Sequence, residues 1–358
     1  MTQQSFGRRA IGFGNRLLRS LGCDTYHYFD NKKAFRFLSN IEAVNGPISQ
    51  KHRSLCDEYA KDVFGKSYYA PWLYTYVATQ GRFIEGWIPD NYYGRTVYPK
   101  AKGEFGALSK FKSLAPRILT APEALFPSGI SIINGVFLTT SGEVIPRENL
   151  AKVIFADGPK AVFKADGSAW GGGVKVVHAD KFSIDQIPPV RAGVVQPYIQ
   201  QHQSLADLGS PAAATIRLTT VIPPNQTPSI RSVFLRLGAT DRDIVDTDSC
   251  YIPMDMKTGV AGTYGFDKDW RPIDRHPGSG IDFKGFQVPS YPQLCQAALN
   301  LHAKIPFVDC IGWDFCVDTD NNVKLFEWNG AHNSIKFGEA TQGPCFTDME
   351  WEKCGLTK

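Results

Sequence analysis

The 358-residue sequence lacks most of the motifs that indicate a familiar chemistry. It has no Cys-x-x-Cys pair and no His/Cys cluster with zinc spacing, which excludes the common structural zinc sites. GxGxxG and GxxxxGK[ST] are also absent, which excludes the two commonest phosphate-binding loops, because both place a helix after the glycines. Without a nucleophile elbow or a Ser/His/Asp order, covalent serine catalysis is not indicated.

Membrane, export and nucleic-acid signals are missing as well. No apolar run approaches the roughly 18 residues that a bilayer requires, and the polar start of the chain indicates no secretory signal. The net charge of +4 is spread along the chain, so nucleic acid is not an expected partner. The eight cysteines are expected to be mostly buried thiols in a reducing, cytoplasmic setting. A basic helix over 8–21 is expected to pack on the protein, with membrane-surface contact as the alternative.

The chain is longer than one ordinary domain, and its patterns divide it into three regions. Residues 1–105 are rich in aromatic and basic side chains and predict a mostly helical region. Residues 106–195 predict short strands, with a hairpin at Asn134-Gly135 and a glycine loop between two later strands. Residues 196–358 predict further strands, a helix over 289–305 and a final hairpin.

That hairpin, IGWDFCVDTDNNVKLFEWNG over 311–330, is the most informative stretch. Its alternation of apolar residues predicts two half-buried strands. A four-residue loop over 319–322 would place Asp314 opposite Glu327, and a two-residue loop would place it opposite Asn329. With either even length the three side chains share one face of the sheet. Because opposed carboxylates destabilise a strand pair, we expect a divalent cation held by Asp314, Glu327 and Asn329.

The glycine loop is a second candidate site. Lys164 ends the strand before it, where an ammonium group can reach a phosphate. Gly171, Gly172 and Gly173 would let backbone N–H groups approach the same phosphate, although a purely structural glycine hairpin is the alternative.

Four further residues have both a functional and an ordinary interpretation. Arg217 and Arg236 lie in alternating strands and would face either a phosphate or carboxylate, or solvent. His202 would contact a base or ribose, or simply lie at the surface. Cys316 is expected to be a buried strand thiol and not a nucleophile.

In chain order, these features are joined by the segments VVQPYIQQHQSLADL, ATIRLTTV and VFLRLG. Together they resemble the ATP-grasp superfamily, most closely its sugar-transfer-associated branch, over about residues 160–345. The resemblance implies an α+β ATP-grasp fold in which two α+β subdomains clamp ATP. The lid with the glycine flap would be 106–195 and the catalytic subdomain 196–358, preceded by the extra helical region.

The resemblance also implies roles for the nucleotide-binding residues. Lys164 matches the lysine that contacts the phosphates, and Gly171, Gly172 and Gly173 match the flap over them. Lys110 or Lys112 would be the upstream lysine that contacts ATP. The strand whose backbone meets adenine would include Gln196, Tyr198 and Ile199.

For the chemistry, Arg217 matches the arginine that faces the γ-phosphate or an acyl phosphate, and Asp314, Glu327 and Asn329 match the Mg²⁺ ligands. The implied activity is that of an ATP-dependent carboxylate–amine ligase, working through an acyl phosphate on small-molecule carboxylate and amine substrates. The branch name suggests a saccharide- or peptide-linked substrate in polysaccharide biosynthesis. A small-molecule kinase on the same fold and a non-catalytic nucleotide-binding protein are the alternatives. The sequence departs from the branch at Ala214, commonly Asn, and over 246–250.

Overall fold

The computed structural model describes residues 25–355 except 102, 103, 121, 123, 124, 128, 169–172, 189, 211, 240–242, 246 and 247. The basic helix expected over 8–21 therefore lies outside the described residues. The described chain divides into two compact units. One is formed by residues up to Lys100 together with Ile335–Lys358, and the other by Ala101–Ser334.

The first unit is helical, as its aromatic-rich sequence predicts. Helix α2 shows why its ends fall where they do: the Ser49 side chain accepts a hydrogen bond from the His52 N–H, and Gly65 adopts the left-handed conformation at φ 77°. The elements of this unit are a helix over 25–45, α2 (Gln50–Phe64), η1 (Ser67–Tyr69), α3 (Ala70–Gln80), α4 (Asp90–Tyr92), η2 (Tyr93–Val97), α5 (Tyr98–Ala101), α10 (Lys336–Gln342), η9 (Thr347–Met349) and η10 (Trp351–Gly355).

Buried polar contacts attach the C-terminal segment to the N-terminal helices. Lys336 Nζ donates to Asp90 Oδ2 at 2.8 Å and lies 5.5 Å from the centre of the Trp72 ring. The fully buried carboxylate of Glu339 accepts hydrogen bonds from the backbone N–H groups of Ile88 and Cys345, both at 2.7 Å. Nothing in the sequence pattern indicated that residues beyond 334 pack with the first hundred.

Glu339 makes the stability of this unit depend on pH. Burial raises the pKa of its carboxyl group from 4.5 to about 7, against the opposing effect of the two hydrogen bonds. Between about pH 4.5 and 7 the unfolded chain has lost this proton while the folded chain retains it. This group therefore lowers the free energy of unfolding as pH rises through that window, by at most ~3 kcal/mol, and adds no further change above it.

The measurement is urea unfolding of the wild type and of Glu339→Gln from pH 4.5 to 7.5. The wild-type value minus the variant value should fall across the window and then level off. A pH-independent difference would contradict the assignment to Glu339.

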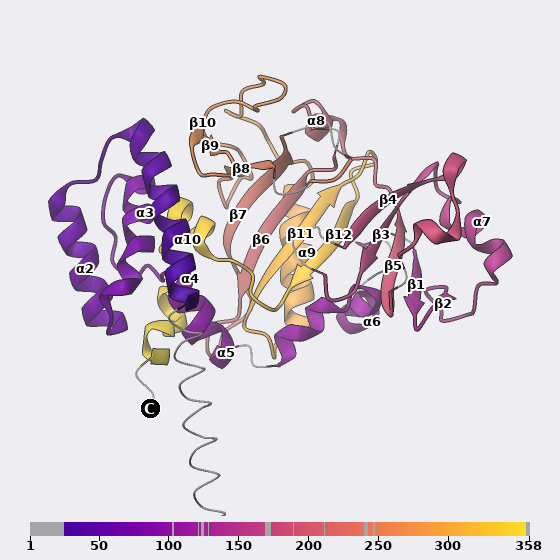
Figure 1. The fold of residues 1–358 in the computed structure, drawn as a ribbon, viewed down its shortest axis with the longest axis horizontal. Helices are drawn as coiled ribbons and strands as arrows, with labels where there is room; N and C mark the ends of the chain where they lie inside the picture. The colour runs from indigo at the N-terminus through magenta and orange to yellow at the C-terminus, as the bar shows by residue number, and fades with distance from the viewer. Residues whose placement is uncertain are drawn as a thin grey trace, which may run out of the picture. The chain divides into compact units, whose positions relative to one another are not determined.

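The second unit contains two antiparallel sheets (Figure 1). The five-stranded sheet has the order β2-β1-β5-β3-β4. The turn at Asn134 and Gly135, with φ of 50° and 78°, joins its first two strands and confirms the predicted hairpin. Its strands and flanking helices are β1 (Ile130–Ile133), β2 (Val136–Leu138), η6 (Arg147–Asn149), α7 (Leu150–Ile154), β3 (Lys160–Ala165), β4 (Val174–His178), η7 (Ala179–Lys181), η8 (Ile184–Gln186) and β5 (Ala192–Pro197).

The seven-stranded sheet has the order β10-β9-β8-β7-β6-β11-β12. Its strands and nearby helices are α8 (Gln203–Ala206), β6 (Thr215–Val221), β7 (Ser229–Gly238), β8 (Ser249–Pro253), β9 (Gly265–Phe266), β10 (Pro272–Ile273), α9 (Tyr291–Lys304), β11 (Cys310–Val317) and β12 (Val323–Asn329). Three short helices precede the five-stranded sheet in the chain: η3 (Phe105–Lys110), η4 (Lys112–Leu114) and α6 (Ala115–Leu119). The mixture of helices and antiparallel strands confirms the predicted α+β class.

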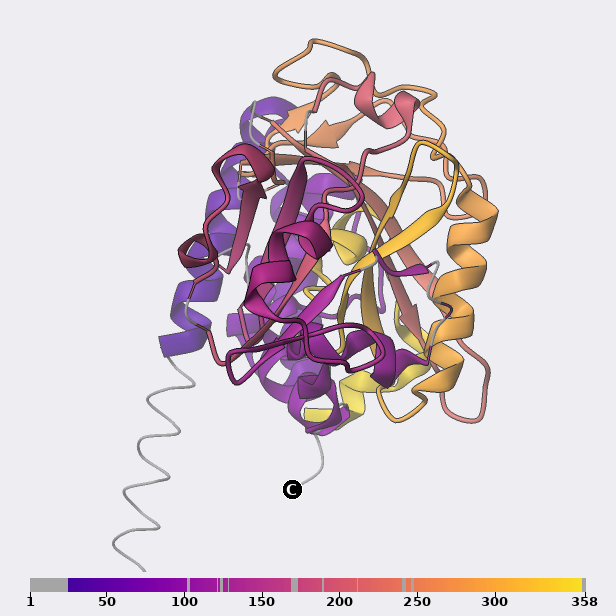
Figure 2. The same cartoon turned by 90° about the vertical axis from the view of Figure 1, so that its right-hand side faces the viewer.

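Helix α9 covers one face of the seven-stranded sheet, and Figure 2 shows it on the side away from the five-stranded sheet. It buries Leu294, Ala298 and Leu301 against the apolar face of the strands. A buried chain of hydrogen bonds fixes it there: His302 Nε2 meets the Val308 carbonyl at 2.7 Å, and His302 Nδ1 meets a Thr220 hydroxyl at 2.7 Å. The opposite face of the sheet is left for the residues of the cleft described below.

The predicted hairpin forms, but neither even loop length is correct. Val317 pairs with Val323, so five residues, 318–322, separate the strands. An odd loop alone would send Asp314 and Glu327 to opposite faces. A β-bulge restores the predicted parity, because Phe315 pairs with Leu325 while Asp314 pairs with Glu327, which leaves Phe326 as the extra residue.

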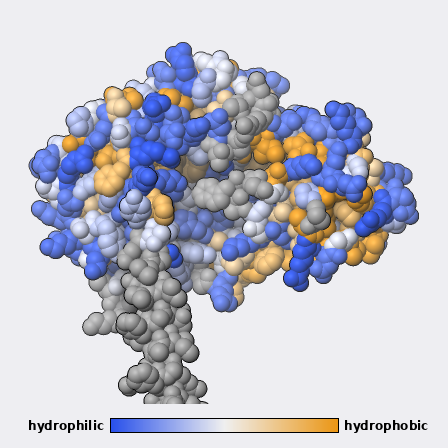
Figure 3. Space-filling model, in the orientation of Figure 1, coloured by the Kyte–Doolittle hydropathy of each residue, from blue (hydrophilic) through white to orange (hydrophobic). Residues whose placement is uncertain are grey.

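In the view of Figure 3, hydrophobic side chains gather mainly over the five-stranded sheet. Val136 of β2 is 42% exposed. Single exposed apolar residues are ordinary on protein surfaces. Among the described residues, no helix has both the length and the apolar character that crossing a bilayer requires.

Candidate functional site

A cleft lies where the polar face of the seven-stranded sheet meets β3, β4 and β5 of the other sheet. It encloses about 930 Å³ of empty space, part of it open to solvent. Eight of the residues singled out from the sequence line it: Lys112, Lys164, Gln196, Tyr198, Ile199, Arg236, Asp314 and Glu327. Segments more than 200 residues apart in the sequence therefore contribute to one cavity.

Three charged residues form a row across the seven-stranded sheet. Arg217 on β6 pairs with Asp314 on β11, which pairs with Glu327 on β12. The guanidinium of Arg217 donates two parallel hydrogen bonds to Asp314, from Nε to Oδ1 at 2.5 Å and from Nη2 to Oδ2 at 2.8 Å. Burial disfavours the cation, but the charge of Asp314 and its hydrogen bonds raise the pKa of Arg217 above its ordinary value. The guanidinium of Arg217 is therefore paired with the carboxylate of Asp314 and not with solvent.

The bulge in β12 gives the cleft two consecutive residues of one strand. Both Phe326 and Glu327 line the cavity, which a regular strand would prevent because neighbouring side chains point to opposite faces. Two residues beyond Glu327 on β12, Asn329 Nδ2 donates to Asp314 Oδ2 at 3.1 Å and to the Gly312 carbonyl at 3.3 Å. The structure therefore brings Asp314, Glu327 and Asn329 to one face, as the sequence predicts.

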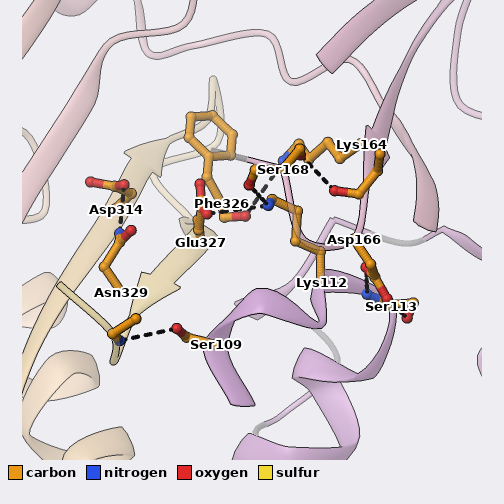
Figure 4. Close-up of polar contacts among 12 residues, drawn as sticks. Ser109, Lys112, Ser113, Lys164, Asp166, Ser168, Asp314, Phe326, Glu327 and Asn329 are labelled. Carbon is orange, nitrogen blue, oxygen red and sulfur yellow. Dashed lines mark hydrogen bonds and ion pairs between the residues drawn. The ribbon is translucent and has the colours of Figure 1, made fainter. Parts of the chain in front are cut away.

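Two lysines approach this acidic row, as Figure 4 shows. Lys164 Nζ donates to the Phe326 carbonyl at 3.4 Å and lies 5.1 Å from the centre of the Phe326 ring. Lys112 Nζ lies 3.4 Å from Glu327 Oε1 and donates to the Ser168 carbonyl at 2.9 Å. Burial lowers the pKa of Lys164 to about 8, with Lys112 acting in the same direction and Glu327 against it. Both ammonium groups stand where an anion in the cleft would meet them.

The end of β5 and the residues that follow it contribute Gln196, Tyr198 and Ile199 to the cleft. Gln196 is 8% exposed, and its Oε1 is buried without a hydrogen-bond partner among the described residues. The Tyr198 hydroxyl donates to the Asp243 carbonyl at 2.9 Å, and burial raises its pKa to about 12. An unused buried acceptor is costly, so a donor group from a ligand would suit Gln196.

Comparisons with known proteins agree with this arrangement. Residues 182–349 match the family described as sugar-transfer associated ATP-grasp. This part of the chain, just under half of it, is similar to the sugar-transfer-associated branch of the ATP-grasp superfamily. The predicted ATP-grasp fold is thereby confirmed, and no curated protein matches the sequence.

Solved ATP-dependent enzymes are only distantly similar. The biotin carboxylase domain of 2-oxoglutarate carboxylase from Hydrogenobacter thermophilus shares 10% identity over 70% of this chain and 46% of its own, with a TM-score of 0.41. D-alanine–D-alanine ligase from Coxiella burnetii shares 11% over 68% and 56%, also at 0.41. Biotin carboxylase from Campylobacter jejuni shares 13% over 90% and 68%, at 0.42. This chain spans about half the length of the first two structures.

The base of the predicted flap is defined, although two of its three glycines, Gly171 and Gly172, lie outside the described residues. Gly173 accepts a backbone hydrogen bond from Ala165 at 2.9 Å. A Cβ atom on Gly173 would approach the Ser168 Cβ to 2.3 Å, so this position has no room for another side chain.

Other residues named from the sequence have ordinary roles. His202 Nδ1 accepts a hydrogen bond from the Ser204 N–H at 3.2 Å and caps α8. Burial raises the pKa of the Cys316 thiol to about 12, which fits the expected buried strand thiol. The backbone carbonyl of Lys110 accepts from Gly167 N at 2.8 Å, while its neighbour Lys112 lines the cleft.

Two further residues of the cleft are Arg236, for which the sequence left an anionic group and solvent as alternatives, and Asp243. Arg236 lines the cavity beside Thr215, with its Nε donating to Ser249 Oγ at 3.1 Å. Asp243 lines it as well and forms an ion pair with Lys160 at 2.9 Å. The alternating pattern of β7 was the only available signal for Arg236, and no motif marked Asp243.

The cluster can accommodate Mg²⁺, given the chemistry of its oxygen donors. Among the described residues, no three His, Cys, Asp or Glu side chains gather into a metal cluster. Mg²⁺, however, needs only one or two carboxylates when phosphates and waters complete its octahedron. Asp314 Oδ1 retains a second lone-pair position beside its bond from Arg217, whereas Oδ2 accepts from both Arg217 and Asn329. Asp314, Glu327 and Asn329 would hold the ion, and this assignment stays a prediction.

Proposed function

We propose that the protein is an ATP-dependent carboxylate–amine ligase that requires Mg²⁺. The observation that carries the proposal is the single cleft in which Lys112 and Lys164 face the carboxylates of Asp314 and Glu327. Cationic side chains on one wall and carboxylates on the other suit a polyphosphate with a bound metal ion. The lysines would neutralise phosphate charge, and the carboxylates would bind the metal.

The apolar side chains of the cleft suit the base of the nucleotide. Val162, Val174, Ile199 and Ile244 line the cleft, and such side chains can enclose a flat ring. The unpartnered Oε1 of Gln196 would accept a hydrogen bond from an amino group of that ring.

The phosphates would lie toward the lysines. Lys112 and Lys164 would bind their oxygens as point charges. Bound Mg²⁺ would supply neutralisation of phosphate charge. Arg217 lies beside this position and would stabilise the charge that develops as phosphate is transferred to a carboxylate.

The carboxylate substrate would lie along β6 and β7, near Thr215 and Arg236. Arg236 lines the same cavity and pairs with Thr215, two residues from Arg217 on β6. Planar guanidinium groups match carboxylates well. The family name supports a saccharide- or peptide-linked acid as the substrate class. An amine would then displace phosphate from the acyl phosphate to give an amide.

The first test is calorimetric titration of the purified protein with ADP, with and without MgCl₂. We expect Mg²⁺ to strengthen ADP binding to the wild type. Most of this strengthening should disappear in Glu327→Ala, because the variant lacks one proposed Mg²⁺ ligand. Asp255→Ala, which removes an exposed carboxylate of a turn in the same unit, is the matched control. Equal Mg²⁺ dependence in the wild type and in Glu327→Ala would contradict the metal assignment.

Product analysis tests the reaction itself. ATP is incubated with mixtures of uronic or amino acids and amines, and ADP, phosphate and amide products are measured. Amide formation that consumes both a carboxylate and an amine supports the ligase. A stable phosphorylated product formed without amine would instead identify a kinase. Nucleotide binding with no turnover of any mixture would favour a non-catalytic protein.

A further inference from the structure

A short segment of the second unit, which we call the strap (residues 105–114), is bound to both walls of the cleft. It comprises η3 and η4 and connects them through Phe111. Figure 4 shows its side chains between the base of the flap and the end of β12. The family match begins only at residue 182, so the strap lies outside it.

One set of contacts holds the base of the flap. Asp166, two residues after Lys164, accepts hydrogen bonds from both the backbone N–H and the hydroxyl of Ser113, at 3.0 and 2.5 Å. The next two residues are also held, because Gly167 N donates to the Lys110 carbonyl at 2.8 Å and Lys112 Nζ donates to the Ser168 carbonyl at 2.9 Å. Three consecutive flap residues are therefore attached to the strap.

A second set of contacts holds the opposite wall. Gly106 lies against the backbone that follows β12: a Cβ atom on Gly106 would approach the Gly330 carbonyl oxygen to 2.4 Å. Ser109 Oγ accepts from Ala331 N at 3.2 Å, and Lys112 Nζ lies 3.4 Å from Glu327 Oε1. The same ten-residue segment thus contacts the strand that carries Glu327 and the loop that begins after Lys164.

We propose that Ser113 and Asp166 are positioning residues, which fix the start of the flap relative to the strand that carries Glu327. They touch neither wall's reacting groups directly and act through the backbone on either side. The role rests on the proposed nucleotide site, because a fixed flap has its effect on a phosphate bound between these walls.

The chemistry of the contact suits a positional role. A carboxylate that accepts two hydrogen bonds from one residue is held in both distance and orientation, and bonds to a charged acceptor are stronger than neutral ones. Ser113 is 6% exposed, so water competes little for these bonds. Lys112 carries three donors and can retain the Ser168 carbonyl while it meets Glu327 or a phosphate. Loss of the Ser113–Asp166 contact would weaken the attachment of the flap to the strap, in which the Lys112–Ser168 and Gly167–Lys110 bonds would remain.

The experiment compares Ser113→Ala, Asp166→Asn, Asp166→Ala and the double variant Ser113→Ala/Asp166→Ala with the wild type. A matched control exists in the same unit. The Thr258 N–H and hydroxyl both donate to Asp255 at 2.7 Å in an exposed turn that does not line the cleft, so Thr258→Ala and Asp255→Asn remove the same kind of contact elsewhere. The readouts are hydrogen exchange of a peptide spanning 165–175, affinity for ADP with Mg²⁺, and the melting temperature.

We expect exchange at the Ala165 and Gly167 amides to accelerate at least about fivefold in Ser113→Ala and Asp166→Ala without nucleotide, since their bonds depend on the flap base. ADP affinity should fall about 5- to 30-fold. Asp166→Asn, which retains an acceptor oxygen, should lose less than Asp166→Ala. The double variant should be no worse than Asp166→Ala, because both changes remove one shared contact.

Three outcomes would overturn the inference. The first is exchange at 165–175 within twofold of the wild type in every variant, and the second is an equal effect of the Thr258 and Asp255 controls. The third is a fall in melting temperature with unchanged flap exchange, which would make the contact merely structural. Failure of the proposed function is distinguishable, because the wild type would then bind no ADP while flap exchange without nucleotide still responded to Ser113→Ala.

Discussion

Replacing Arg217 with alanine is expected to reduce kcat/KM for ATP turnover by about 10³-fold or more. The guanidinium directs both of its parallel bonds at Asp314, which lines the cleft, so its loss removes the cation nearest the proposed transfer and leaves the carboxylate without its partner. An uncompensated, largely buried charge also destabilises the fold, here by about 2–3 kcal/mol, because Asp314 retains some solvent contact. Steady-state ADP release and urea unfolding measure the two effects.

A double variant separates these effects. Arg217→Ala/Asp314→Ala removes both charges, so it should recover much of the lost stability while remaining inactive. Arg217→Lys retains the charge without the two-pronged geometry and should retain stability better than activity. Recovery of turnover in the double variant would exclude a catalytic role for Arg217.

Replacing Lys164 with methionine is expected to weaken ADP binding about 10- to 100-fold and to lower kcat/KM by about 10²-fold or more. Its ammonium group is enclosed beside Phe326, with Glu327, Asp314 and Lys112 as the neighbouring charges. Methionine retains the apolar stem, so the loss reports the charge. Lys175→Met on β4, whose ammonium group donates to the Gln186 carbonyl outside the cleft, is the matched control. Unchanged ADP affinity in Lys164→Met would exclude this lysine from the phosphate site.

The same residue sets an expected pH dependence. Burial lowers the pKa of Lys164 to about 8, so the free protein loses this charge as pH rises through 8. A phosphate favours the charged form and raises that pKa on binding. ADP affinity should therefore be constant below about pH 7.5 and fall by up to tenfold per pH unit above 8, with proton uptake on binding. Lys164→Met should show no such fall between pH 7.5 and 9.5.

Residue patterning predicted the regular parts of this molecule because their periodicity is local. Strand alternation located β6, β7 and β11, and helical spacing with a proline near its start located α9. The clustering of Lys164, Asp314 and Glu327 followed from parity and from the order of the motifs.

Contacts between distant segments could not be predicted in the same way. The alternation of its own strand leaves Arg217 facing either an anionic group or solvent. Only the register between β6 and β11 shows that its partner is Asp314. The strap has no periodic pattern, and its contacts join Ser113 to Asp166 across 53 residues. The fully buried Glu339 of α10 likewise follows from packing with a segment some 250 residues away.

The five-residue turn over 318–322 and the extra residue Phe326 together keep Asp314 opposite Glu327. A change in the length of the turn therefore requires a compensating change at the bulge. Deleting one turn residue while the bulge is retained would shift β12 by one residue relative to β11. Either the residues of β12 before the bulge or Glu327 itself would then point to the wrong face. An alignment that places a gap in the turn must therefore place a compensating one near Phe326. Otherwise it assigns the role of Glu327 to one of its neighbours, either Phe326 or the buried Trp328.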